Sequence, residues 1–216
     1  AVVVPEDLEP KMGRIVVFHL VDGKLQQVAE KEIKGAPYQI QEFNGKLLTA
    51  INSTIRLFEW TAMHDLHNEC TYFNSIVSLY FKTKGDFVIV GDILRSITLL
   101  LYKPLNGNFE MIATDLETSW LSTLEIIDDD TYIASDNSFN LFTVQKDASA
   151  VIDAERQRLL QVGYFHLGDF VNVMKQGSLV MNHPCEMSCP IMGKPILFGT
   201  VSGGLGMCSS TCVLNI

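Results

Sequence analysis

The sequence has 216 residues, of which 47% are hydrophobic and 19% charged, and Asp+Glu outnumber Lys+Arg by 25 to 16, giving a formal net charge of −9 at pH 7. So apolar a chain can offset its ordering entropy by burial, which excludes an intrinsically disordered protein. Its acidity excludes a direct nucleic-acid binder whose affinity comes from neutralising phosphates, so any link to DNA would run through a partner.

Membrane and secreted proteins are not expected either. The apolar run Ile97–Tyr102 has the length of a strand and is far shorter than the roughly 20 residues of a spanning helix. Residues 1–10 carry three acidic side chains where a signal peptide would be apolar. An odd number of cysteines does not suggest a disulfide framework, so we expect an intracellular protein. Because the sequence does not start with Met, we expect it to begin inside a larger protein.

Short strands separated by turns are expected along most of the chain. The expected strands are residues 14–20, 25–33, 46–51, 55–60, 76–81, 87–90, 97–102 and 139–144. Gly-containing pairs such as Asp22-Gly23 and Asn44-Gly45 lie between them and favour tight hairpins. The acidic run at 128–130 could bind a cation, but a solvated hairpin turn is the favoured interpretation.

An internal repeat organises these strands. Ile55, Ile97 and Phe139 occupy the same place in three similar segments and are separated by 42 and again by 42 residues. Residues 13–18 fit the template 40 residues earlier, and residues 199–207 resemble a damaged fifth copy. A β unit that recurs at about 40–45 residues is typical of a propeller blade. The Trp-Asp dipeptide of the common WD repeat is absent, so we expect a divergent propeller; the alternative is a coincidental spacing of strands.

One segment interrupts the β pattern. Residues 149–163 contain Asp153–Gln161, a run of good helix formers with acidic residues first and Gly163 as a stop. We therefore expect a short helix inserted between blade strands. Strands are expected again at 165–167 and 170–174, followed by a loop with three prolines at 183–195.

Several runs together resemble one known family. They are Gly13–Phe18 with Asp22–Gln26, Glu42–Leu48 with Ile51–Thr54, Lys82–Phe87 with Val90–Asp92, and Phe165–Val173. These runs resemble the damage-specific DNA-binding protein 1 family, the adaptor of cullin-4 ubiquitin ligases. The resemblance covers roughly residues 5 to 205 and lies in the third of that family's three propellers. Related cleavage-polyadenylation and splicing factor 3b subunits share the architecture but resemble these runs much less.

The resemblance implies a scaffold, not an enzyme, and no cofactor. It implies an all-β fold, with about four to five blades of a seven-bladed β-propeller in residues 1–206 and a divergent tail at 207–216. The propeller type is the one that ends the A subunit of the cleavage-polyadenylation factor. In the family, the first and third propellers receive substrate receptors of cullin-4 ligases, and a propeller absent here holds the cullin. DNA would be reached only through a receptor, in DNA damage recognition and nucleotide excision repair. The resemblance also implies a location in the nucleus and in the cytoplasm.

Ten positions match the receptor-facing surface of the family's third propeller. They combine apolar and aromatic side chains with an Arg and two Asn residues, a mixture typical of binding hot spots. The positions are Asn74, Leu79, Tyr80, Ile93, Arg95, Trp120, Phe170, Asn172, Val173 and Val201. For Leu79, Ile93, Val173 and Val201, burial in the blade core is the alternative. Val77 and Thr114 replace a Met and an Arg of the family pattern, which puts the local affinity in doubt.

Other chemistries have weaker signals. Cys185 and Cys189 precede Cys208 and Cys212 with His183 nearby, a spacing that allows a zinc site, but ordinary loop thiols are the favoured interpretation. The sequence has no nucleophile elbow, phosphate-binding loop or zinc-protease helix motif. Two function classes therefore remain: an adaptor module of a ubiquitin ligase, and a partner-binding propeller of RNA 3′-end processing or splicing.

Overall fold

The structure is a computed structural model that describes residues 9–147, 149–177 and 195–209. The described residues form strands almost throughout, with one short helix, α1 (Asp153–Arg156). The chain divides into two compact units, one of residues 1–93 and 97–112 and one of residues 94–96 and 113–216. No helix among the described residues is long and apolar enough to cross a membrane.

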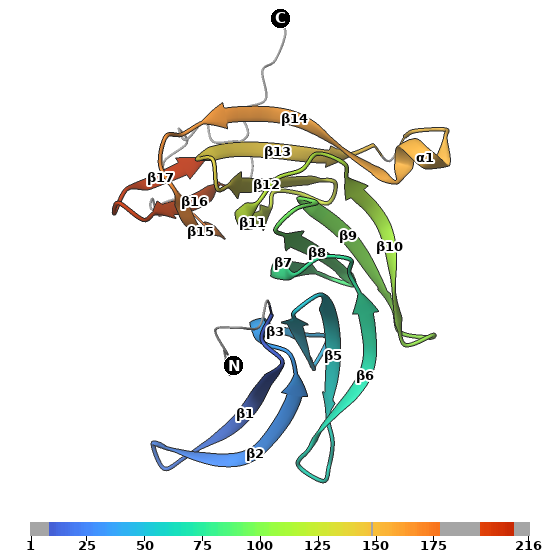
Figure 1. Ribbon diagram of the computed structural model, residues 1–216, viewed down its shortest axis with the longest axis vertical. Helices are drawn as coiled ribbons and strands as arrows, with labels where there is room; N and C mark the ends of the chain where they lie inside the picture. Colours follow the sequence, from blue (N-terminus) through green and yellow to red (C-terminus); the bar gives the residue numbers. More distant parts are fainter. Residues whose placement is uncertain (1–8, 148, 178–194, 210–216) are drawn as a thin grey trace, which may run out of the picture. The chain divides into compact units, whose positions relative to one another are not determined.

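The first unit consists of antiparallel strands joined in chain order. A hairpin of β1 (Met12–Val21) and β2 (Lys24–Lys34) comes first. A four-stranded sheet follows, with strands β3 (Pro37–Phe43), β4 (Lys46–Ile51), β5 (Thr54–Trp60) and β6 (Leu66–Phe73) side by side (Figure 1). Then come β7 (Ser78–Lys84), β8 (Phe87–Asp92), β9 (Ile97–Lys103) and β10 (Asn108–Asp115), whose last residues belong to the second unit. Sequential antiparallel strands of this kind are the pattern of a propeller blade.

Consecutive blades of the first unit pack face to face. One buried cluster joins Leu48 and Leu57 of the β3–β6 sheet to Phe81 and Leu100 of the next sheet, and all four side chains are at most 1% exposed. Hydrogen bonds join residues that are 42 positions apart. Gln39 Oε1 accepts a hydrogen bond from the Phe81 N–H at 2.9 Å, and Gln39 Nε2 donates one to the Phe81 carbonyl at 2.7 Å. The first strand of one blade therefore contacts the first strand of the next, as expected for a propeller.

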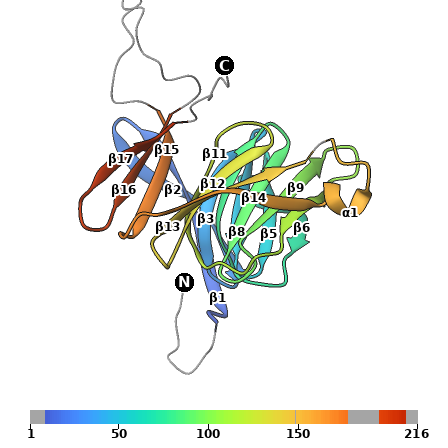
Figure 2. The same cartoon turned by 90° about the horizontal axis from the view of Figure 1, so that it is seen from above.

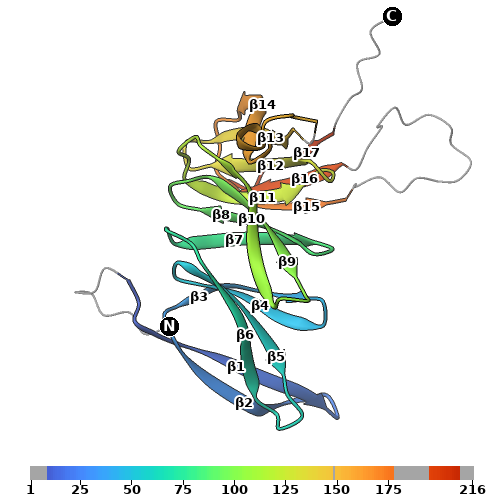
Figure 3. The ribbon, with the colours of Figure 1, turned by 90° about the vertical axis from the view of Figure 1, so that its right-hand side faces the viewer.

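The hairpin β1–β2 packs on the other face of the β3–β6 sheet. Ile15 and Ile33 of the hairpin form a buried cluster with Ile51, Phe58 and Leu66. Figure 3 shows the two strands alongside β5 and β6. Residues 13–18 thus lie in a strand, as the repeat predicts.

The second unit has two sheets of the same kind. The first contains β11 (Leu121–Ile126), β12 (Thr131–Asp136), β13 (Asn140–Lys146) and β14 (Arg158–His166), all antiparallel (Figure 2). The second contains β15 (Val171–Gln176), β16 (Ile196–Thr200) and β17 (Leu205–Cys208). Ile133 and Leu141 of the first sheet pack against Val171, Met174 and Ile196 of the second. The propeller-type all-β fold expected from the sequence is confirmed.

The expected repeat is present, but the third strands recur every 43 residues and not every 42, so the expected register is off by one residue in two of the three copies. The third strands of the three blades begin at Thr54, Ile97 and Asn140, which are 43 residues apart. Phe139 therefore does not correspond to the buried Ile55. It precedes β13, has a φ of +66° and is 42% exposed, and its counterpart is Ser96, which also has a φ of +66°.

The expected short inserted helix is confirmed, but it is shorter than the run of helix formers that predicts it. The helix is a single turn, Asp153–Arg156, and residues from Arg158 onward form β14. The good helix formers after Arg156 do not extend the helix, because β14 pairs along its length with β13, from Asn140↔His166 to Lys146↔Leu159. Tertiary pairing overrides intrinsic helix propensity, which is worth only a few tenths of a kcal/mol per residue.

Other expectations concern turns and boundaries. The 128–130 run is a hairpin turn between β11 and β12, in which Asp128 Oδ1 accepts hydrogen bonds from the backbone N–H groups of Asp130 and Thr131. β17 continues across the expected boundary at residue 206, so a tail at 207–216 stays a prediction. Most of the proline-containing loop at 183–195 lies outside the described residues.

Candidate functional site

The ten predicted partner-binding residues share one location in their sheets. Each precedes or opens the first strand of a blade, or follows the second strand. Asn74 precedes β7 and Leu79 and Tyr80 lie at its start, whereas Ile93 and Arg95 follow β8. In the second unit, Trp120 precedes β11, Phe170 precedes β15, Asn172 and Val173 open β15, and Val201 follows β16. Within an antiparallel blade, the start of the first strand and the end of the second strand are adjacent, so all ten belong to the same type of blade end.

In the first unit, hydrogen bonds fix the predicted polar residue. The backbone N–H of Asn74 donates to the carbonyl of Ser53 at 2.8 Å, and its Nδ2 donates to Ser78 Oγ at 3.1 Å and to the buried Asp92 Oδ2 at 3.4 Å. The next residue's backbone N–H donates to Asn74 Oδ1. Asn74 therefore holds this blade end together through its hydrogen bonds and still keeps part of its side chain exposed.

The neighbouring predicted residues of the first unit are half-buried. Leu79, Tyr80 and Ile93 each keep part of their side chain exposed. Burial raises the pKa of Tyr80, and its hydroxyl, which is protonated near neutral pH even at the ordinary Tyr pKa, can donate a hydrogen bond to a partner. For Leu79 and Ile93, half-burial is compatible with both packing and contact with a partner.

In the second unit, the predicted apolar residues lie on the surface. Trp120 is 56% exposed, Val173 54% and Val201 68%, and Arg95 is also exposed. Burial in the blade core is therefore wrong for Val173 and Val201. Large exposed apolar side chains accompanied by a cation are what a protein-binding surface requires.

A short polar network holds the loop that carries Phe170. Asp169 Oδ1 accepts a hydrogen bond from the Phe170 N–H at 2.8 Å, and Asp169 Oδ2 accepts one from the Ser202 hydroxyl. Hydrogen bonds from Ser202 and Thr200 lower the pKa of Asp169, which keeps the carboxylate ionised. The start of β15 and the turn after β16 are therefore joined.

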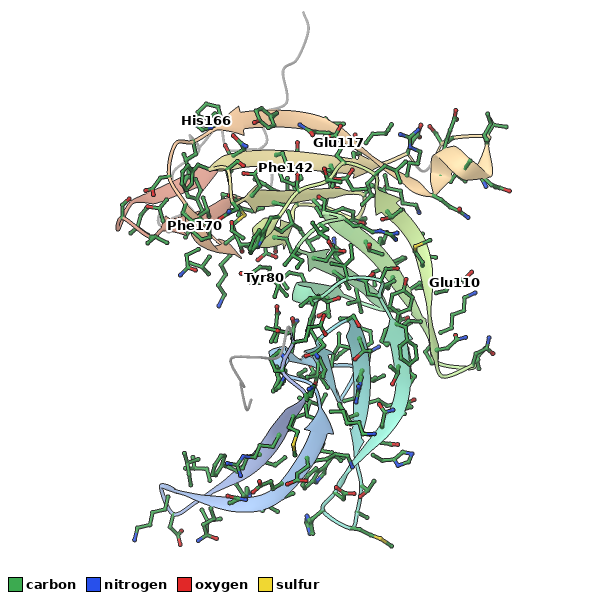
Figure 4. All side chains as sticks on the ribbon, in the orientation of Figure 1. Tyr80, Glu110, Glu117, Phe142, His166 and Phe170 are labelled. Atoms are coloured by element: carbon green, nitrogen blue, oxygen red, sulfur yellow. The ribbon has the colours of Figure 1, made fainter. Side chains whose placement is uncertain are left out.

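Two further residues of this blade end were not predicted. The Phe139 ring lies edge-to-face with the Phe170 ring, with centroids 6.5 Å apart and planes at 80°. His166 Nδ1 lies 2.7 Å from Asn140 Oδ1, at the end of β14. Figure 4 labels both His166 and Phe170 at this end of the second unit. Phe139 was not predicted because the repeat aligns it with a buried strand residue, Ile55. The polar run Asp136–Ser138 directly before Phe139 is the signal in the sequence that indicates a turn.

The described residues hold no group of three or more side chains that could bind a metal ion. His183, Cys185, Cys189 and Cys212 of the considered zinc set lie outside the described residues. Cys208 is half-buried, and burial raises the pKa of its thiol. Burial also raises the pKa of the Cys70 thiol, to about 11, so neither thiol is an activated nucleophile.

Comparison with known proteins identifies the relatives of this chain. Residues 1–212 match the CPSF A subunit region. The chain is 49% identical over 207 residues to "DNA damage-binding protein 1" of Drosophila melanogaster, covering 96% of this chain and 18% of the relative. It is 47% identical over 215 residues to the protein of the same name from Solanum lycopersicum, covering 97% of this chain and 20% of the relative. It is 48% identical over 214 residues to "DNA damage-binding protein 1a" of Arabidopsis thaliana, again covering 97% and 20%.

The chain thus spans about a fifth of the length of these relatives. The match extends beyond the described blades, to residue 212. All three relatives carry in their names the binding of damaged DNA, although this chain is acidic, with a net charge of −9.

Proposed function

Because this chain belongs to the CPSF A subunit region family, and within it to the DNA damage-binding protein 1 relatives, we propose that it forms the receptor-binding part of a cullin-4 ubiquitin-ligase adaptor. In this function the chain is a non-catalytic scaffold. It binds the receptor, and the receptor recognises the substrate. Its cullin contact is expected from another propeller of the longer protein, and its location is the nucleus and the cytoplasm.

The observation that carries the proposal is the surface at the blade ends of the second unit. Trp120 is 56% exposed, and exposed Val173 and Val201 lie near the half-buried Phe170 at the start of β15. Burying a large aromatic side chain in a protein interface contributes about 2 kcal/mol or more when the surroundings exclude water. Such a surface suits a partner with an apolar face, for example an amphipathic helix.

The acidic charge of the chain supports indirect contact with DNA. A net charge of −9 repels phosphates, so this region lacks the electrostatic term that supplies most non-specific affinity for DNA. We propose that damaged DNA is reached through the receptor that this region holds. The link to DNA damage recognition and nucleotide excision repair then follows from the partner and not from the blades themselves.

A second candidate is a propeller of an RNA 3′-end-processing or splicing factor subunit. The description of the matched family, CPSF A subunit region, favours it. The identities of 47–49% to DNA damage-binding protein 1 proteins favour the adaptor instead. Both candidates predict a protein-binding surface, and they differ in the partner.

Capture of a receptor tests the proposal. The chain is used by itself and also joined into the full-length Solanum lycopersicum relative, where it replaces the 215 matching residues. Each protein is immobilised and presented with the purified DNA-damage-sensing receptor of the cullin-4 ligase. We expect capture, and we expect Trp120→Ala or Arg95→Ala to weaken it at least tenfold.

The matched control lies at the opposite end of a blade. Leu105 is fully exposed in the β9–β10 turn, so Leu105→Ala removes an exposed apolar side chain far along the sheet from Ile93. We expect this variant to bind as the parent does. A folded chimera that does not capture the receptor would refute the adaptor function, and capture of a 3′-end-processing factor instead would establish the second candidate.

A further inference from the structure

The backbone at Phe139 is held in an unfavourable conformation. A φ of +66° is costly for an aromatic residue, whose Cβ approaches the backbone carbonyl in the left-handed region. The Phe139 carbonyl accepts hydrogen bonds from the N–H groups of Leu167 and Gly168, at 3.0 and 3.3 Å, and its own N–H donates to Asp136 O at 3.3 Å. Strain of this kind persists where the surroundings enforce it, and it is concentrated at functional sites.

The conformation presents the ring at the surface. Phe139 is 42% exposed. Its ring forms an edge-to-face pair with Phe170, one of the predicted partner-binding residues. The pair therefore forms an apolar surface between the β14–β15 connection and the β12–β13 turn.

A buried hydrogen-bond chain fixes the neighbouring histidine. Asn140 is 6% exposed, and its Nδ2 donates to the buried Asp136 Oδ2 at 2.8 Å. The Asn140 Oδ1 must then be the atom that faces His166 Nδ1, at 2.7 Å, and it can only accept. The neutral His166 ring thus carries its hydrogen on Nδ1 and leaves Nε2 as a hydrogen-bond acceptor. The His166 side chain is exposed, so Nε2 is available to a partner.

The second polar group beside the ring pair is also an acceptor. The Asp169 carboxylate supports the loop of Phe170 and keeps further lone pairs for a partner. An apolar surface flanked by an imidazole acceptor and a carboxylate is complementary to an apolar side chain that lies beside a cation.

We propose that the Phe139–Phe170 ring pair, flanked by His166 Nε2 and the Asp169 carboxylate, is a docking point for a receptor segment that places an apolar side chain beside a Lys or Arg. The inference rests on the proposed function, because it names what the receptor must present at this blade end. It adds Phe139, His166 and Asp169 to the partner-binding residues.

One variant removes the Phe139 ring without adding strain. Phe139→Gly deletes the side chain and its contact with Phe170 but relieves the positive φ, and the melting temperature measured beside the affinity separates loss of binding from loss of the fold. Ser96→Gly is the control for the backbone change alone, because Ser96, whose side chain is buried, occupies the equivalent turn of the preceding blade with the same φ of +66°. We expect Phe139→Gly to lower the affinity for the receptor about tenfold at an unchanged or higher melting temperature of the chain. We expect Ser96→Gly to leave the affinity unchanged.

Two substitutions separate the roles of the His166 nitrogens. His166→Asn can keep the donor to Asn140 but loses the acceptor at the Nε2 position. His166→Gln reaches the Nε2 position with an oxygen acceptor but loses the bond to Asn140. We expect His166→Asn to bind the receptor several-fold more weakly and His166→Gln to recover part of that loss.

The charge requirement is tested by salt. Asp169→Asn removes the negative charge, keeps an oxygen that accepts from the Phe170 N–H, and replaces the other oxygen with an NH2 that can only donate to Ser202 Oγ. We expect this variant to lower the affinity for the receptor several-fold at about 50 mM NaCl. We also expect Kd to depend less on salt between about 50 and 300 mM, because the ion pair that salt screens has been removed.

The outcomes distinguish this inference from the function on which it rests. A parent chimera that captures the receptor, with Phe139→Gly, His166→Asn and Asp169→Asn all within twofold of it, would refute the docking point and leave the adaptor function intact. A parent chimera that captures no receptor would refute the adaptor function itself.

Discussion

Loss of one hydroxyl at the junction of two blades should measurably weaken the first unit. Tyr102 in β9 donates a hydrogen bond to Glu69 Oε1 in β6 at 2.7 Å. The same carboxylate accepts hydrogen bonds from Lys46 Nζ in β4, at 2.6 Å to Oε1 and 2.5 Å to Oε2. The perturbation is Tyr102→Phe, which removes only the hydroxyl. The ring keeps its contacts with Phe43 and Phe109, at centroid distances of 5.7 and 5.3 Å.

The size of the effect follows from burial and charge. Tyr102 is 3% exposed, and the Glu69 side chain is 22% exposed. A hydrogen bond to a charged group contributes about 1.5–3 kcal/mol, and partial exposure of Glu69 places this one at the lower end. We expect the free energy of unfolding to fall by about 1.5 kcal/mol, or about 3–6 °C in melting temperature for a chain of this size.

The effect should depend on pH in a defined direction. Burial raises the pKa of Glu69, but hydrogen bonds from Lys46 and Tyr102 outweigh it, and the net pKa lies below its usual range. A carboxylate with a lowered pKa stabilises the fold above its unfolded-state pKa, near about 4.3, and this contribution is lost as the pH falls through the folded-state pKa. The difference between parent and Tyr102→Phe should therefore be full at pH 7 and shrink below about pH 4.

Urea unfolding followed by fluorescence at pH 7 and pH 3.5 measures both quantities. Tyr132→Phe is the matched control, because Tyr132 is 2% exposed and donates to a neutral acceptor, the Asp129 carbonyl, at 2.9 Å. Its loss should cost about 1 kcal/mol. A Tyr102→Phe variant as stable as the parent, or a destabilisation unchanged at pH 3.5, would show that the hydrogen bond to the Glu69 carboxylate does not stabilise the fold.

Three further changes have defined outcomes in the same unfolding assay. Phe81→Ala empties a site that is 0% exposed between two blades, and should cost about 3–5 kcal/mol; a loss below about 1 kcal/mol would contradict the face-to-face packing. Gln39→Ala leaves the buried Phe81 N–H unpaired and should cost about 1–3 kcal/mol, an estimate that an unchanged urea midpoint would overturn. Gly35→Ala places a Cβ 2.9 Å from Ile51 and Asn52 at a φ of +105° and should cost more than about 1 kcal/mol, well above Gly45→Ala, whose Cβ meets nothing within 4 Å; equal losses would argue against the close approach.

The sequence predicts the blades well because their signal is local. Turn pairs such as Asn44-Gly45 adopt the positive φ that a tight hairpin needs, at +52° and +76°. Alternating burial then fixes the strands between them. The contact between successive repeats is also visible, as hydrogen bonds between Gln39 and Phe81, which are 42 positions apart.

The errors have a different origin, since they depend on pairing between distant segments. Residues after Arg158 have good helix propensity, yet they pair with β13 instead. Phe139 has a strand-like neighbourhood, but a turn with positive φ places it on the surface. No local pattern could reveal that the Asn140 amide orients the His166 ring, because that contact joins residues 26 positions apart.

The affinity of the chimeric full-length protein for the DNA-damage-sensing receptor tests the central proposal most directly. We expect saturable capture by the parent, a loss of affinity of at least tenfold for Trp120→Ala and for Arg95→Ala, and no loss for Leu105→Ala. A folded parent that does not bind, or three variants that bind equally well, would contradict a receptor-binding role for these blade ends.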